Sequence, residues 1–214
     1  MGGMFNYCQK LKEIKGLNRF NTSQVYYMRI MFQDCHELVY LDLTNFDTSN
    51  VKNMEGMFIF CLKLKEIKGL DNFNTSKVTN MSRMFENCEE LENLNLSKFD
   101  TSKVTNITGM FNNCYKIRNI IGLNRFNTSQ VINMDGMFQG CNELEYLDLS
   151  NFDTSKVIDF GLIFNNCHKI IKIVGLNKFN TSQVNNMAGM FQECYELESL
   201  DLSNFNTSKV KNMK

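Results

Sequence analysis

The sequence has no proline, no tryptophan and no net charge. Its 23 Lys and Arg residues balance its 23 Asp and Glu residues, so it lacks the basic surface that attracts nucleic acids or anionic membranes. No apolar run approaches the ~18 residues that a membrane-spanning helix needs. We therefore expect neither a nucleic-acid partner nor insertion into a membrane.

Paired metal ligands and catalytic sets are missing as well. Zinc sites need close ligand pairs such as C-x-x-C, but each of the eight cysteines stands alone. His36 and His168 each follow a cysteine, and no second ligand recurs beside both of them, so we interpret them as solvated turn residues. We expect no catalytic residue, no metal and no cofactor, and we classify the protein as a non-enzyme.

The cysteines recur with a regular spacing. They occupy positions 8, 35, 61, 88, 114, 141, 167 and 194, so gaps of 27 and 26 residues alternate. Such a period is typical of a solenoid, in which each repeat contacts only its neighbours. We predict one domain over residues 1–214, made of eight repeats that form four 53-residue double repeats without distinct caps. The cysteines are expected to form a stack of buried, reduced thiols.

Each repeat contains a pattern typical of a leucine-rich repeat. In the shorter form Leu38, Leu41 and Leu43 follow the spacing L-x-x-L-x-L and alternate with polar residues, as a half-buried strand does. The longer form contains one extra residue, and a glycine always accompanies it. Glycine tolerates the positive φ that a bulge or tight turn needs. These glycines are Gly16, Gly69, Gly122 and Gly175.

The second half of each repeat has a different period. Val51, Met54, Met57, Phe58 and Cys61 would lie on one face of a helix, and residues 47–49 offer N-cap side chains. We therefore predict an α/β solenoid: a right-handed leucine-rich-repeat coil with a parallel sheet of eight strands on one face and eight short helices on the other.

Charge alternates from repeat to repeat. The residue two places after each cysteine is in turn Lys or Glu: Lys10, Glu37, Lys63, Glu90, Lys116, Glu143, Lys169 and Glu196. Strands in a sheet lie about 4.8 Å apart, so the alternation should set the register by pairing opposite charges.

The two ends of the chain are complementary in sequence. Joining Lys214 to Gly3 recreates an internal stretch, and the first strand is basic where the last is acidic. We therefore expect the protein to bind a second copy of itself head to tail, forming a ring or a filament. The alternative is that the chain is a fragment of a longer array. The predicted end-to-end interface comprises Gly3, Met4, Phe5, Lys10, Leu11, Lys12, Ile14, Lys15, Glu196, Leu197, Glu198, Leu200, Asp201, Leu202, Val210 and Met213.

The shared element L-x-x-L-D-L-S-x-F-D-T-S-x-V-x-N-M-x-x-M-F-x-x-C resembles the BspA-like leucine-rich repeats of mycoplasmas, other bacteria and protists. Its clearest copies run from Leu91 to Cys114 and from Leu144 to Cys167. The resemblance implies cell-surface display, adhesion or protein binding without enzymatic activity, although the N-terminus reads as the inside of a repeat and not as a signal peptide. A monomeric adhesin that binds a protein or glycan through Tyr40 and Tyr146 of the strand face is the second hypothesis.

Overall fold

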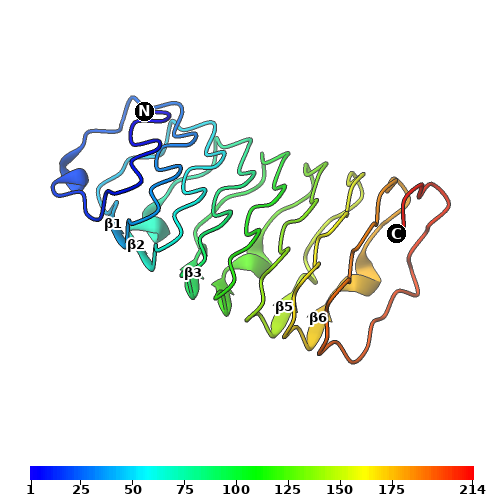
Figure 1. The fold of residues 1–214 in the computed structure, drawn as a ribbon. Coiled ribbons are helices and arrows are strands. Elements are labelled where there is room, and N and C mark those ends of the chain that lie inside the picture. The colour runs from blue at the N-terminus through cyan, green and yellow to red at the C-terminus, as the bar shows by residue number, and fades with distance from the viewer.

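The computed structural model describes all 214 residues as an elongated coil, with the two termini at opposite ends (Figure 1). We number the repeats R1 to R8 in the order of their cysteines, from Cys8 in R1 to Cys194 in R8. Successive repeats lie side by side along the coil, so residues about 26 positions apart in the sequence become neighbours in space.

One face of the coil carries the strands. Six strands of three residues form three parallel two-stranded sheets instead of the single sheet of eight strands that we predicted. The pairs are β1 (Tyr40–Asp42) with β2 (Glu66–Lys68), β3 (Asn93–Asn95) with β4 (Asn119–Ile121), and β5 (Tyr146–Asp148) with β6 (Lys172–Val174). The corresponding segments of R1 and R8 are not strands, so the prediction of one strand in every repeat is wrong at both ends of the coil.

Four short 3-10 helices follow the strand segment of the longer repeats. They are η1 (Leu17–Arg19), η2 (Leu70–Asn72), η3 (Leu123–Arg125) and η4 (Leu176–Lys178). Each is preceded by the extra glycine of the longer form, whose φ lies between +77° at Gly16 and +97° at Gly175. The prediction that these glycines adopt a positive φ is confirmed.

The opposite face, which we call the turn face, contains consecutive turns instead of the predicted helices. In R2 the Met31 N–H donates to the Met28 carbonyl at 3.3 Å, whereas the next N–H, that of Phe32, donates to the Met57 carbonyl of R3 at 2.9 Å. The N–H groups thus alternate between a turn within the repeat and a bond to the following repeat. No helix forms, because half of these donors bind outside their own segment.

The turns also explain why the helix prediction was wrong. A four-residue turn directs an apolar side chain inward every three or four residues, which is the spacing of a helix face. In the structure the turns differ from a helix in their backbone angles. Each repeat contains two residues with positive φ four positions apart, as at Gly56 and Phe60 or at Gly109 and Asn113. Left-handed residues at that frequency cannot belong to a right-handed helix.

The core is one continuous cluster between the two faces. Its most regular part is a stack of phenylalanine rings, one per repeat, with centroids 5.4 to 6.0 Å apart. The eight cysteines are free, and the six inner ones are buried beside this stack, as predicted. From R2 onward each thiol donates a hydrogen bond of 3.1 to 3.3 Å to the carbonyl of the stacked phenylalanine in the preceding repeat.

Candidate functional site: the strand junctions and the two end surfaces

The junctions between repeats are of two kinds on the strand face. A shorter repeat and the longer repeat after it are joined by a strand pair, which occurs at R2/R3, R4/R5 and R6/R7. We call these junctions closed. No strand hydrogen bonds join a longer repeat to the shorter repeat after it, at R1/R2, R3/R4, R5/R6 and R7/R8. We call these junctions open. The turn face does not share this difference, because its parallel bridges run without a gap from Tyr27 to Asn212.

Each closed junction carries one of the predicted charge pairs. Glu37 meets Lys63 at 2.8 Å, Glu90 meets Lys116 at 2.6 Å, and Glu143 meets Lys169 at 2.8 Å. The hydrogen bond from the lysine lowers the pKa of each of these carboxyl groups from its usual value. Lys10 and Glu196 occupy the same position in R1 and R8 and have no ionic partner within the chain.

The closed junctions also need a glycine. A Cβ atom added at Gly69 would lie 2.4 Å from the Cα of Thr44, and one added at Gly122 would lie 2.4 Å from the Cα of Ser97. The extra glycine of the longer repeat therefore lets its backbone approach the preceding shorter repeat. Gly16 has the same conformation, but a Cβ there would meet no atom within 4 Å, because no repeat precedes R1 in this chain.

Two open junctions contain grooves on the strand face. The groove at R5/R6 has a volume of about 260 Å³, and its polar lining comes from Arg118, Asn119, Asn124, Tyr146 and Asp148. The groove at R3/R4 measures about 210 Å³ and lies between β2 and β3. Tyr146, one of the two predicted strand-face residues, is 54% exposed at the first groove. Tyr40 is also exposed, but it lies outside both grooves.

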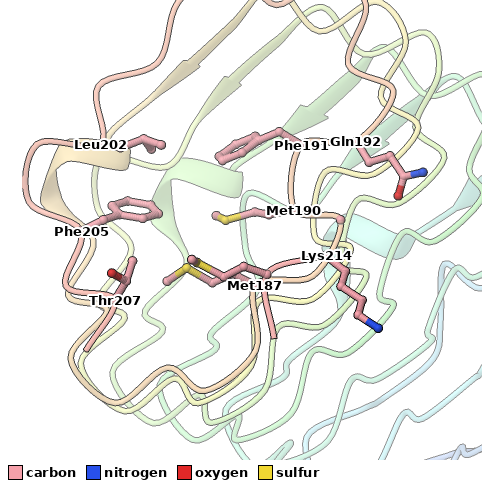
Figure 2. Close-up of a pocket in the computed structure, with 10 residues that line it drawn as sticks. Met187, Met190, Phe191, Gln192, Leu202, Phe205, Thr207 and Lys214 are labelled. Carbon is pink, nitrogen blue, oxygen red and sulfur yellow. The ribbon is translucent and has the colours of Figure 1, made fainter. Parts of the chain in front are cut away.

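The C-terminal end surface is an apolar hollow of about 570 Å³ in R8 and the adjoining turn. Met187, Met190, Phe191, Leu202 and Phe205 point into this hollow, whereas the polar ends of Gln192 and Lys214 point away from it (Figure 2). Leu202 is 37% exposed, although its counterparts in the inner shorter repeats are fully buried. The end of the core is therefore open to solvent.

The N-terminal end surface is the opposite side of the same stacking pattern. Phe5, Leu11 and Ile14 are only half-buried, and Met4 is exposed. Lys10, Lys12 and Lys15 of the same repeat are exposed, and the Lys15 ammonium lies 3.8 Å from the Glu13 carboxylate. This surface is thus apolar with a basic border, whereas Glu196, Glu198 and Asp201 give the C-terminal end an acidic border.

The structure places the predicted end residues on two separate surfaces, at opposite ends of the coil (Figure 1). It does not bring the two halves into contact within one chain. Leu202 and Met213 line the C-terminal hollow, and Gly3, Leu197 and Val210 are half-buried at the ends. The prediction missed Met187, Met190, Phe191 and Phe205. Their repeat positions could have revealed them, since the equivalent residues of inner repeats are core residues.

The cysteines and histidines have structural environments. Burial raises the pKa of the Cys35 thiol to about 12 and that of Cys194 to about 11, which keeps both protonated near neutral pH. His36 lies 3.2 Å from Asp34, and His168 stacks on Tyr195. Both histidines are half-buried, so the prediction that they are solvated is only partly correct. No helix in the structure has the length and apolarity to span a bilayer.

The repeated strand, turn and core pattern defines the class of the protein as a leucine-rich-repeat solenoid. A leucine-rich repeat protein from Eubacterium ventriosum matches 98% of this chain with a TM-score of 0.56 at 15% identity. The chain spans about half (52%) of the length of that protein. A leucine-rich cell surface protein from Faecalibacterium prausnitzii is 16% identical over 92% of this chain and 67% of its own, with a TM-score of 0.33.

The family can also be stated. The sequence matches the family described as "Mycoplasma protein of unknown function, DUF285" over residues 1–68, 60–175 and 137–214. The chain therefore belongs to this family, and the predicted resemblance to the repeats of mycoplasmas is confirmed. No curated protein matches the sequence.

Proposed function

We propose that this protein is a non-catalytic structural and binding repeat whose copies associate head to tail. The observation that carries the proposal is the complementarity of the two end surfaces. Each exposes core side chains, and one has a basic border where the other has an acidic one. A second copy placed end to end would cover both surfaces and pair opposite charges.

The apolar side chains supply the driving force for this association. Leu200 and Leu202 are 36% and 37% exposed, whereas the corresponding leucines of the inner shorter repeats are at most 3% exposed. Complete burial of one such side chain contributes about 1.5–3 kcal/mol. Covering the hollow of R8 together with Leu11 and Ile14 of the next copy therefore gives several favourable contributions.

The contact would be heterologous, because it joins two different surfaces. Such a contact forms a ring if the rotation between copies closes, and a filament if it does not. The copies would continue the coil in the same direction in either case. Display at the cell surface, which the family resemblance implies, is part of the same proposal.

Light scattering and negative-stain imaging of the purified 214-residue chain test the association. We expect particles larger than one chain at micromolar concentration, and we expect the double variant Leu11→Glu, Ile14→Glu to remain monomeric. The double variant Ile132→Glu, Ile171→Glu is the control, since it adds the same charges at exposed apolar positions of inner repeats. Strictly monomeric wild-type protein would contradict the proposal, and so would persistent assembly of the double variant.

A monomeric binder is the second candidate function, favoured by the groove at the R5/R6 junction. Tyr146 and Arg118 line this groove, and tyrosine and arginine are the residues that most often dominate binding energy at protein interfaces. Binding to panels of immobilised proteins and glycans should then be lost in Tyr146→Ala and retained in Tyr195→Ala, a tyrosine outside the groove. Equal binding by both variants would remove this candidate.

A further inference from the structure

We infer that the contact between two copies is a closed junction, formed by R8 of one copy and R1 of the next. This inference rests on the proposed head-to-tail association and specifies its register. Closed junctions in the chain always join a shorter repeat to the longer repeat that follows it. R8 is a shorter repeat and R1 a longer one, so their contact falls in the same class.

The backbone groups left free at the two ends match those of a closed junction. In the inner closed junctions the N–H groups of Leu43, Leu96 and Leu149 donate to the carbonyl groups of Lys68, Ile121 and Val174. The N–H group of Leu202 is equivalent and has no backbone partner, and the carbonyl of Lys15 accepts no backbone bond. Residues 199–201 and 13–15 would therefore form a fourth strand pair.

The turn face offers the same match from residue 3 onward; Lys214 already accepts the bond from the Gly189 N–H, so Met1 and Gly2 of the next copy would have to move aside. The Phe164 N–H donates to the carbonyl of Met190, as in every inner repeat, but the Phe191 N–H has no acceptor and the Met4 carbonyl has no donor. A bond between these two groups would place the ring of Phe191 on that of Phe5. The phenylalanine stack would then continue from one copy into the next.

Gly16 is the most specific feature of this inference. Its counterparts Gly69, Gly122 and Gly175 pack against the backbone of Thr44, Ser97 and Ser150 in the preceding shorter repeat. The equivalent residue of R8 is Ser203. Gly16 has a φ of +77° and no atom within 4 Å of a Cβ added to it. It therefore has the conformation of its counterparts without a neighbouring backbone to pack against.

The substitution Gly16→Asn tests this contact. Asn tolerates a left-handed backbone, and the space around Gly16 admits its side chain, so the monomer should keep its circular dichroism and its urea midpoint. The concentration needed for half-assembly should rise about tenfold or more, because the added atoms overpack the junction. Arg125→Asn, on η3 of an inner repeat, is the matched control and should assemble like the wild type.

The outcomes separate this inference from the proposed function. If wild-type protein assembles and Gly16→Asn assembles equally well, the closed junction is wrong while head-to-tail association stands. If wild-type protein never assembles, the proposed function fails and the junction with it. A folded Gly16→Asn monomer with impaired assembly supports both.

A charge exchange tests the register independently. Lys10 and Glu196 correspond to Lys63 and Glu37, whose charged atoms lie 2.8 Å apart in a closed junction. Lys10→Glu and Glu196→Lys should each weaken assembly, and the double variant should restore it, because the pair is then reversed but again complementary. A double variant no better than either single one would overturn this register.

Discussion

The turn face and the strand face hold the same repeats together in different ways. On the turn face every repeat bonds to the next through the same backbone pattern, and the bridges from Tyr27 to Asn212 are continuous. On the strand face closed and open junctions alternate. The turn face therefore joins all repeats in the same way. The strand face alternates between paired strands and unpaired junctions, and the grooves lie at unpaired junctions.

The difference follows from where the extra residue of the longer repeat is placed. The bridge residue lies eight positions before the cysteine in both forms, as Asn53 does before Cys61 and Asn80 before Cys88. The extra residue lies instead between the strand and the bridge. The turn face thus has the same length in every repeat. The longer repeats accommodate their extra residue after the strand, where a glycine with positive φ precedes a 3-10 helix.

The largest expected effect tests whether the turn face dominates cohesion. Phe111→Ala removes a buried ring from the middle of the stack and should lower the free energy of unfolding by about 3–5 kcal/mol. Leu147→Ala, in β5 on the strand face, should cost less. Urea denaturation followed by circular dichroism measures both, and a larger loss for Leu147→Ala would reverse the comparison.

The next effect distinguishes closed junctions from the free end. Gly122→Ala should cost about 1–2 kcal/mol for a left-handed alanine, plus ~1–3 kcal/mol for overpacking against Ser97. Gly16→Ala carries only the first cost in the monomer, since its Cβ meets no neighbour. Thermal and urea unfolding at concentrations that keep the chains monomeric should therefore separate the two variants. Equal losses would mean that the close approach at Gly122 has no energetic weight.

A smaller effect tests the turns themselves. Arg83 has a φ of +56° at a position where most other repeats place glycine. Arg83→Gly should stabilise the fold by up to ~1 kcal/mol, because relief of the left-handed strain exceeds the entropy that glycine loses. Thr105→Gly is the control, an exposed turn-face residue without a positive φ, and it should destabilise by about 0.5–1 kcal/mol. The same sign in both variants would contradict this description of the turns.

The smallest expected effect concerns the charges of the closed junctions. The folded state lowers the pKa of Glu90, so its contribution to stability is present above the unfolded pKa and is lost as the pH falls through the folded one. Because this carboxylate is close to solvent, Glu90→Gln should cost only a few tenths of a kcal/mol at pH 7. The difference from wild type should therefore shrink as the pH falls below the usual glutamate pKa near 4.3. Glu145→Gln, which breaks no ion pair, is the control for this substitution.

The repeat period, the buried thiols and the inward strand residues were predictable from the sequence. Leu41 and Leu43 alternate with polar residues, and the structure buries both. The alternating charges also predicted Lys63 on Glu37, which the structure confirms, but they predicted Lys63 on Glu90 as well, and Glu90 pairs instead with Lys116 of the following repeat. These features depend on side-chain pattern alone, which a sequence records directly.

The turn face and the alternation of junctions were not predictable in the same way. The spacing of Met54, Met57 and Phe58 is the same for a helix and for consecutive turns, so hydrophobic period could not separate them. Whether two strands pair depends on backbone positions set by the whole repeat. The extra glycine marked a difference between the two forms, but its consequence for pairing appears only when neighbouring repeats are stacked.

The continuous ladder of the turn face also determines how the coil responds to force. Its hydrogen bonds run along the long axis and join successive repeats, so a pull on the two termini loads them in series and breaks them one junction at a time. Repeats would peel away singly from an end and fall back into place when the tension is released. Extension of the coil under load would therefore proceed in steps of one repeat.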